Sequence, residues 1–204
     1  MIEPSSATEA RPGLRERKKA RTRQTIQEQA LRLFREQGYD RTTVEQIAEA
    51  AEVSPSTFFR YFPTKEDVVL YDALDPLLAE SFRRQPAELT ALQALREAMR
   101  EVWGALSPTE VDEQLERGRL AFRVPALRER YVIEMVRTAS LMVDLVAERL
   151  GRPADDFEIR VATGAVMGGV LAAMVPMYES DGSLDAIALM DRAVEVLEGG
   201  FAKL

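Results

Sequence analysis

The chain has 204 residues, enough for one large domain or two small ones, and it contains neither cysteine nor histidine. The missing cysteine excludes disulfides and thiolate chemistry, and the missing histidine removes the commonest general base and metal ligand. Catalysis would depend on carboxylates alone, and no paired-carboxylate site is evident. We therefore expect no enzymatic activity, no metal site and no cofactor.

Charge is distributed unevenly along the chain. The net charge of −7 argues, on average, against a nucleic acid as partner. Between Arg11 and Arg23, however, seven basic residues stand against Glu16 alone, whereas residues 71–204 carry 15 basic and 23 acidic side chains. The basic segment is either a solvated tail or a nucleic-acid contact, and the elements that follow it must distinguish the two.

The first predicted helix follows a polar lead-in. Residues 1–13 lack an apolar core, so they are neither a signal peptide nor a membrane anchor, and we interpret them as a disordered arm. Apolar residues then recur with helical spacing at Ile26, Ala30 and Phe34. This pattern predicts a helix that Gly38 ends.

Two short helices are predicted next. A capping-box pattern at 42–45 predicts the start of a second helix, and residues 52–54 break it. Ser54 can cap a third helix with Pro55 at its first position, and Pro63 ends that helix. Two short helices joined by a three-residue turn form a helix-turn-helix.

A fourth helix is predicted over 65–84, with Thr64 as its cap. Pro76 falls in its interior and removes a hydrogen bond, so we interpret Pro76 as a hinge. Breakers beyond residue 85 predict five further helices, and no segment alternates with period two. The sequence therefore predicts an all-α fold of about nine helices: a disordered arm (1–13), a three-helix helix-turn-helix domain (14–64), a connecting helix (65–84) and a larger helical domain (85–204).

The third predicted helix holds four aromatic residues in the stretch STFFRYF, residues 56–62. On a helical wheel Phe58 and Phe62 share one face, which can close a core. The other side chains point away from that face: Ser56, Thr57, Phe59, Arg60 and Tyr61. Hydroxyl groups and an arginine on an outward face suit the base edges of a DNA major groove.

The stretch TTVEQIAEAAEVSPSTFFRYFPTKEDVV closely resembles the N-terminal domain of the TetR family of bacterial transcriptional regulators. The similarity spans residues 14–70 and includes the paired threonines, the aromatic-rich third helix and the Phe-Pro-x-Lys-Glu motif. It implies a homodimer whose recognition helices enter successive major grooves. It also implies a larger C-terminal helical domain that binds a small effector.

The resemblance assigns roles to individual residues. The phosphate contacts that it implies are Thr42, Thr43, Tyr61 and Lys65. The base contacts that it implies are Ser56, Thr57 and Arg60. Ser54 and Thr43 have a second interpretation as helix caps, with phosphate contact as the alternative. The basic arm, Arg15 to Arg23, would follow the DNA backbone or enter the minor groove.

Two positions depart from the family pattern. Glu52 stands where family members often have glycine, so a left-handed backbone there would carry roughly 1–2 kcal/mol of strain. Phe59 stands where the family usually has tyrosine, and it offers only apolar contact to sugar or thymine methyl. We therefore expect one phosphate contact fewer than in the family.

Residues 161–178 carry no charge over 18 positions, which is long enough to span a membrane. The stretch is rich in glycine and alanine and contains Pro176, so we expect a helix buried on every side and no membrane span. In the family this helix pairs with the last helix in an isologous four-helix dimer interface. The residues expected there are Gly164, Gly168, Gly169, Ile187, Val194 and Leu197.

Methionines and aromatic residues lie on the apolar faces of several C-terminal helices. They are either ordinary core or, as a set, the lining of an adaptable apolar pocket. The stretch Val124 to Arg128, with the long helix after it, resembles regulators that bind acyl-CoA-like or other lipophilic ligands. The candidate ligand residues are Met99, Trp103, Phe122, Met135, Met142, Met167 and Met174.

These features predict a sequence-specific DNA-binding regulator, a repressor that a small apolar effector releases from a pseudo-palindromic operator. Three alternatives stay open: a ligand-dependent activator, a regulator that needs a co-repressor, and a helical small-molecule-binding module without DNA binding. The expected partners are double-stranded operator DNA, the effector and a second copy of the chain, in the cytoplasm.

Overall fold

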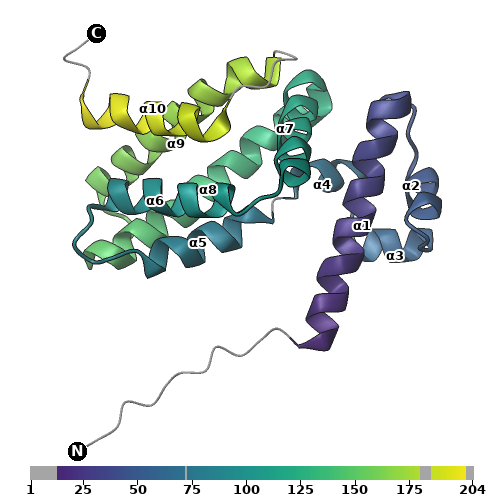
Figure 1. Ribbon diagram of the computed structural model, residues 1–204, viewed down its shortest axis with the longest axis horizontal. Coiled ribbons are helices and arrows are strands. Elements are labelled where there is room, and N and C mark those ends of the chain that lie inside the picture. Colours follow the sequence, from purple (N-terminus) through teal and green to yellow (C-terminus); the bar gives the residue numbers. More distant parts are fainter. Residues whose placement is uncertain (1–12, 72, 180–184, 201–204) are drawn as a thin grey trace, which may run out of the picture. The chain divides into compact units, whose positions relative to one another are not determined.

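The computed structural model describes residues 13–71, 73–179 and 185–200, and over these residues it contains helices and no strand (Figure 1). This confirms the all-α fold class. The chain divides into two compact units, Met1–Val68 and Val69–Leu204. The helices are α1 (Leu14–Gln37), α2 (Val44–Ala50), α3 (Pro55–Tyr61), α4 (Lys65–Leu70), α5 (Leu74–Arg84), α6 (Ala91–Gly104), α7 (Pro108–Arg123), α8 (Pro125–Leu150), α9 (Phe157–Glu179) and α10 (Ala186–Glu198).

The connecting helix expected over 65–84 is two helices, α4 and α5, so the described residues hold ten helices rather than nine. Pro76 is the third residue of α5. The backbone N–H groups of a first turn have no partner within the helix, and proline is tolerated there. The interior hydrogen bond that Pro76 was expected to break does not exist, so the hinge interpretation loses the observation on which it rested. The two units meet between Val68 and Val69 rather than before residue 65.

The N-terminal unit packs α1, α2 and α3 around one small core. Gly38 ends α1 as expected, with a φ of 87° that glycine adopts without strain. The capping box of α2 lies one residue later than the sequence pattern placed it, with Thr43 as the cap and Gln46 as its partner. The largest buried side chains of the core come from all three helices: Ile26, Leu31, Phe34, Ile47, Phe58 and Phe62.

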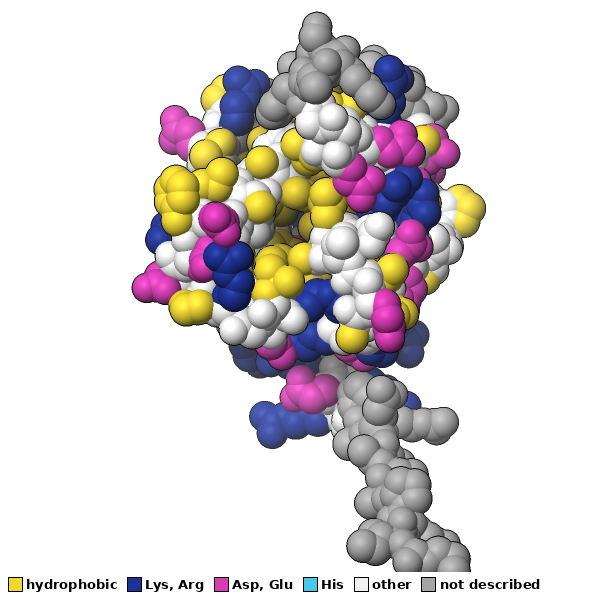
Figure 2. Space-filling model, turned by 90° about the vertical axis from the view of Figure 1, so that its left-hand side faces the viewer, with side chains coloured by type: hydrophobic (Ala, Val, Ile, Leu, Met, Phe, Trp, Pro, Cys, Tyr) yellow, Lys and Arg dark blue, Asp and Glu magenta, His cyan; other side chains and the backbone are white. Residues whose placement is uncertain are grey.

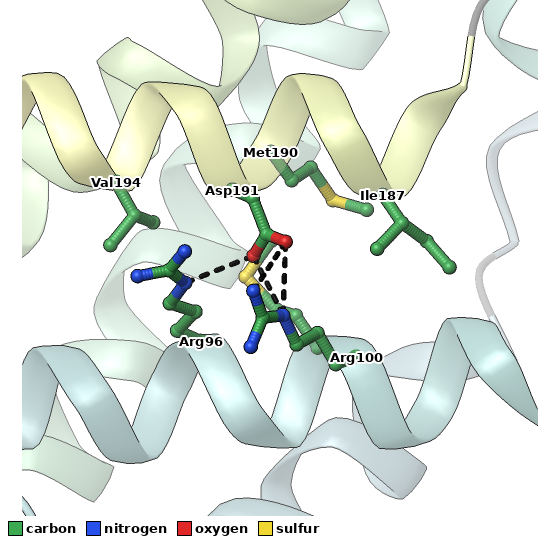
Figure 3. A pocket seen from close by; sticks show the side chains of 7 residues that line it. Arg96, Arg100, Ile187, Met190, Asp191 and Val194 are labelled. Carbon is green, nitrogen blue, oxygen red and sulfur yellow. Dashed lines mark hydrogen bonds and ion pairs between the residues drawn. The ribbon is translucent and has the colours of Figure 1, made fainter.

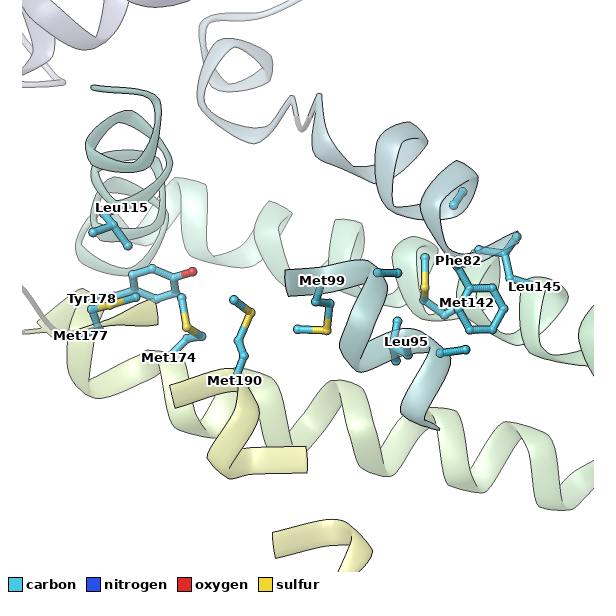
Figure 4. Packing of buried hydrophobic residues seen from close by; sticks show 13 residues of the cluster. Phe82, Leu95, Met99, Leu115, Met142, Leu145, Met174, Met177, Tyr178 and Met190 are labelled. Atoms are coloured by element: carbon cyan, nitrogen blue, oxygen red, sulfur yellow. The ribbon is translucent and has the colours of Figure 1, made fainter. Parts of the chain in front are cut away.

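The core of the C-terminal unit is rich in methionine. Five methionines from α6, α8, α9 and α10 share one buried cluster with aromatic and aliphatic side chains (Figure 4). These methionines are Met99, Met142, Met174, Met177 and Met190. Methionine fills irregular space without a fixed shape, so the interior of this unit can repack more easily than a core of branched side chains.

Ion pairs attach α10 to α6. Asp191 on α10 accepts a hydrogen bond from Nε of Arg96 at 3.0 Å and from Nη2 of Arg100 at 2.6 Å (Figure 3). Burial raises the pKa of Asp191, but the hydrogen bonds from Arg100 and Arg96 outweigh burial and hold the pKa below its ordinary value. Asp191 therefore stays charged and connects two arginines of α6 to the last helix.

Candidate nucleic-acid interface and ligand site

The recognition helix α3 separates its rings as the helical wheel predicted. Phe58 and Phe62 are fully buried, whereas Ser56 and Arg60 are exposed and Thr57 is half-buried. The two buried rings lie 5.9 Å apart and fix one face of α3 against the core. The opposite face is therefore presented to solvent with hydroxyl groups and one guanidinium group.

Ser54 caps α3 and connects its hydroxyl groups. Its Oγ accepts a hydrogen bond from the backbone N–H of Thr57 at 3.1 Å and donates to Thr57 Oγ1 at 2.9 Å. Ser56 Oγ lies 3.0 Å from the same oxygen. The capping interpretation of Ser54 is confirmed, and the cap also orders the two hydroxyl groups expected to contact bases.

The turn before α3 has a left-handed residue that is not glycine. Glu52 has a φ of 54°, so this position does adopt the left-handed backbone for which family members often use glycine. A residue with a Cβ atom is strained in this conformation by roughly 1–2 kcal/mol. The strain belongs to the turn that sets the angle between α2 and α3.

Phe59 is 49% exposed, and its ring meets Phe58 edge-on with 5.5 Å between the ring centroids. Without a hydroxyl group, Phe59 offers a partner only an apolar edge. This position fits contact with a thymine methyl group or a sugar and gives no hydrogen bond to phosphate.

Two expected phosphate contacts have other roles. Thr42 is only 1% exposed, and its hydroxyl group donates to the backbone oxygen of Gly38 at 2.9 Å. Nζ of Lys65 donates to the backbone oxygens of Tyr39 and Thr42 at 2.9 and 3.1 Å and lies 4.1 Å from the Tyr39 ring centroid. Both side chains hold the loop between α1 and α2 together. Phosphate contact by the Thr42 hydroxyl is therefore wrong, because that group is buried and bonded.

Thr43 and Tyr61 keep exposed surface. Thr43 is exposed and accepts the backbone N–H of Gln46 at 3.3 Å, so it is a cap with a free side toward solvent. Tyr61 is half-buried and lines a groove of about 830 Å³ between the start of α1 and the end of α3. The other residues that line the groove are Leu14, Arg15, Glu16, Lys18, Lys19, Thr22 and Arg60. Four of the lining side chains are cationic and one is acidic, so the groove attracts anions.

The candidate ligand residues fall mostly in the methionine-rich core. Met99, Met142 and Met174 belong to the buried cluster, while Trp103, Phe122 and Met167 pack against it. Met135 is half-buried on α8 and is not part of this cluster. Figure 2 shows hydrophobic side chains gathered around a hollow on one face of the C-terminal unit.

Phe122 stands in an aromatic wall with two tyrosines, Tyr131 and Tyr178, that the sequence pattern did not single out. The ring of Tyr178 stacks on Phe122 with 5.1 Å between centroids, and Phe122 meets Tyr131 at 5.4 Å. A Cβ atom at Gly118 would stand 2.1 Å from the Tyr178 ring. The isolated glycine inside a helical pattern was the available signal, because such a glycine often marks a close approach.

The residues expected at a dimer interface divide into two groups. Gly164 and Gly168 are exposed, and a Cβ atom added at either would have no other atom of the described chain within 4 Å. Gly169 instead contacts Leu197 within the chain, where a Cβ atom would stand 3.1 Å from Leu197 Cδ1. Val194 is buried in the chain and is not available to a second copy, so its assignment is corrected. Ile187 is half-buried and packs against the methionine-rich core.

The expectation that α9 is buried on every side is wrong for the single chain. The helix is long and apolar enough to cross a membrane, and only 22% of its most apolar window is buried. Phe157 and Val161 are 78% and 53% exposed. One helix of this kind is weak evidence for a membrane span, because a helix that another protein covers has the same composition.

A capped recognition helix on a three-helix core, joined to a larger helical unit with an apolar interior, defines a helix-turn-helix DNA-binding regulator. The family described as bacterial regulatory proteins, tetR family, matches residues 26–71, and the MftR C-terminal domain matches residues 89–202. The chain belongs to the TetR family of bacterial transcriptional regulators.

Similar proteins extend over most of the chain. The transcriptional regulator TcmR of Streptomyces glaucescens is 41% identical over 152 residues, which cover 71% of this chain and 67% of TcmR. The transcriptional repressor AcnR of Corynebacterium diphtheriae is 30% identical over 86% of this chain and 89% of its own length. The repressor FadR of Thermus thermophilus, solved in complex with lauroyl-CoA, has a TM-score of 0.58 and 25% identity over 88% of this chain and 94% of FadR.

Proposed function

We propose that the chain is a cytoplasmic repressor that binds a pseudo-palindromic operator as a homodimer and is released by an apolar effector in its C-terminal unit. The observation that carries the proposal is the exposed face of α3, where Ser56, Thr57 and Arg60 stand opposite a fully buried pair of rings. Hydroxyl groups and a guanidinium group match the hydrogen-bonding edges of bases in a major groove. The similarity to AcnR supports repression as the direction of control.

Exposed apolar side chains support an isologous dimer interface along α9. Phe157 and Val161 continue into the exposed small residues Gly164 and Gly168 at helical spacing. A glycine inside a helix costs up to about 1 kcal/mol relative to alanine, and nothing within the described chain explains these two. Close approach of the same helix from a second copy supplies a reason, and it would cover the apolar face as well.

The interior of the C-terminal unit supports a lipophilic effector of the acyl-CoA class. Methionines can repack around a flexible acyl chain. The hollow in Figure 2 is surrounded by hydrophobic side chains, so an apolar ligand could enter there. The similarity to a FadR solved with lauroyl-CoA makes this ligand a suitable first probe.

A buried arginine offers a route from the ligand site toward the start of the C-terminal unit. Arg117 on α7 donates from Nε to the backbone oxygen of Val69 at 2.9 Å. The next residue of α7, Gly118, lies directly against the Tyr178 ring. A ligand that displaces Tyr178 would therefore shift α7, whose Arg117 is hydrogen-bonded to the backbone of Val69.

Selection of genomic fragments by the purified protein tests the proposal. We expect enrichment of a two-fold symmetric sequence, bound with a Kd on the order of 10⁻⁸ M or lower and weakened by salt. Lauroyl-CoA should then reduce operator affinity by about 5- to 150-fold, whereas free CoA should leave it unchanged.

The same experiment separates the alternatives. Ligand binding without enrichment of any fragment would favour a helical small-molecule-binding module. Higher transcription from the operator on addition of protein and ligand together would favour an activator. Neither alternative predicts release of a tightly bound operator by the acyl chain.

A further inference from the structure

Two arginines from different helices lie over one ring in the N-terminal unit. The guanidinium carbon of Arg60, at the end of α3, is 5.5 Å from the centroid of the Tyr61 ring. The guanidinium carbon of Arg23, on α1, is 5.7 Å from the same centroid. Both distances lie within the range at which the face of an aromatic ring attracts a cation.

We propose that Tyr61 is a positioning residue in DNA recognition: its ring, rather than its hydroxyl group, holds Arg60 ready for a base edge and Arg23 ready for a neighbouring phosphate. The inference deepens the proposed function and rests on DNA binding by α3. It replaces the phosphate contact that the family resemblance implied for the Tyr61 hydroxyl group.

Arg60 needs such support because little else restrains it. Among the residues that the structure describes, Arg60 makes no hydrogen bond and no ion pair, and its side chain interacts with the Tyr61 ring. An arginine side chain loses much rotational freedom when it forms two parallel bonds to guanine. A ring that limits this freedom before DNA arrives reduces the entropy lost on binding.

Tyr61 is itself held firmly enough to serve this purpose. It is half-buried on α3, and its neighbour in sequence, Phe62, is fully buried. The ring lines the groove between α1 and α3, together with Arg15 and Lys18 of the basic arm. The arm is a regular helix from Leu14, so its cations are placed by the same rigid element that carries Arg23.

The ring and the hydroxyl group can be separated by paired substitutions. Tyr61→Phe keeps the ring and removes the hydroxyl group, whereas Tyr61→Leu removes both. Tyr61→Gln is made in parallel as a second variant without a ring, so that a folding defect in one of them does not decide the result. Thermal unfolding of each protein identifies the variants that are folded.

Each variant is titrated against the operator that the parent protein selects and against a library with every base pair of that operator randomised. We expect Tyr61→Phe to bind within about two-fold of the parent. We expect Tyr61→Leu and Tyr61→Gln to lose about 5- to 25-fold in affinity for each half-site, which corresponds to two cation–ring contacts in each protomer. They should also relax base preference at the position that Arg60→Ala relaxes.

Two further readouts distinguish positioning from a general loss of structure. The double variant Arg60→Ala/Tyr61→Leu should have the same base preference as Arg60→Ala alone, because Tyr61 acts on that base only through Arg60. The slope of log affinity against log salt should become shallower by about 1.8 in the variants without a ring, since Arg23 of each protomer then leaves one phosphate. In Tyr61→Phe the slope should stay that of the parent.

Three results would overturn the inference. An equal loss in Tyr61→Phe and Tyr61→Leu would mean that the hydroxyl group makes the contact. Parent-like binding by both variants without a ring would mean that the ring has no role. A parent protein that selects no operator would overturn the regulator function, and this inference with it.

Discussion

The helices α3 and α9 both present side chains that a single chain does not cover, but they do so in opposite ways. The recognition helix hides Phe58 and Phe62 and exposes hydroxyl groups with Arg60. The long helix α9 exposes Phe157 and Val161. A polar face remains soluble until a charged partner arrives, whereas an apolar face of this kind requires lasting cover. The difference supports a transient partner for α3 and a permanent one for α9.

Net charge also differs between the N-terminal segment that precedes the helix-turn-helix and the C-terminal unit that contains α9. Seven basic residues lie between Arg11 and Arg23, whereas residues 71–204 carry 15 basic and 23 acidic side chains, a net charge of −8. A polyanion is attracted to the first region and repelled by the second. The chain therefore needs no high overall positive charge to direct DNA to α3.

A charge on the exposed face of α9 gives the largest effect that we expect. Val161→Glu should convert the dimer to a monomer, because a carboxylate would be buried between the two copies. Operator affinity should then fall by about 100-fold or more, since each half-site is bound singly. Light scattering measures the mass, and Val161→Ala, which keeps an apolar side chain, should remain a dimer. If Val161→Glu remained a dimer, the exposed face of α9 would not be the dimer interface, and α9 would no longer differ from α3 in having a permanent partner.

Loss of the guanidinium group on α3 comes next in size. Arg60→Ala should weaken operator binding by about 10- to 100-fold and relax preference at one base pair, because a bidentate contact to guanine is lost. Arg35→Ala removes an exposed arginine near the end of α1 and should leave preference unchanged. Binding titrations on the operator and on single-base variants measure both effects. Parent-like preference in folded Arg60→Ala would exclude Arg60 as a base contact.

The ion pairs of α10 should have a moderate effect on stability. Asp191→Asn leaves Arg96 and Arg100 without their shared carboxylate and should lower the midpoint of thermal unfolding by about 2–4 °C at pH 7. The exposed Asp144→Asn serves as control and should change the midpoint little.

Acidification should remove this difference. Because the folded-state pKa of Asp191 is depressed, its contribution is fully present above the unfolded-state pKa of about 3.9 and is lost as pH falls through the folded-state value. Parent and Asp191→Asn should therefore converge below about pH 4. A gap between the two that widens on acidification would contradict the assigned sign.

Relief of backbone strain before α3 should give the smallest effect. Glu52→Gly removes the Cβ atom from a residue with φ of 54° and should stabilise the protein by about 1 kcal/mol. Glu49→Gly, at an exposed position in the last turn of α2, should destabilise it by up to about the same amount. Denaturant unfolding measures both variants. Equal destabilisation by the two glycines would show that Glu52 carries no strain.

Local signals in the sequence predict the N-terminal unit well. Ser54 and Gly38 act through their immediate neighbours, so a pattern of a few residues predicts the ends of α1 and α3. The i, i+4 spacing of Phe58 and Phe62 likewise predicts which face of α3 is buried. The helix-turn-helix could therefore be predicted almost completely.

The errors at single residues arise where a side chain closes a loop instead of facing solvent. Lys65 reaches back to the backbone oxygen of Tyr39, and this bond depends on how the chain folds. Thr42 sits directly before a helix cap, yet its hydroxyl group is used to close the preceding turn. The break between α4 and α5 was missed because the apolar periodicity continues across it. The spacing of apolar residues does not show whether the backbone between two helical turns stays helical.

The close packing of Tyr178 against Gly118 offers a way to engineer the range of effectors that the protein accepts. The Tyr178 ring packs directly on the backbone of Gly118, so a larger residue at position 118 would clash with the ring. A larger side chain at position 118 therefore requires a smaller one at position 178. Shortening Tyr178 would open a space the size of one ring beside Phe122, and Gly118→Ala would refill part of it. These two positions form a matched pair with which a biosensor built on this chain could be tuned to effectors of different bulk.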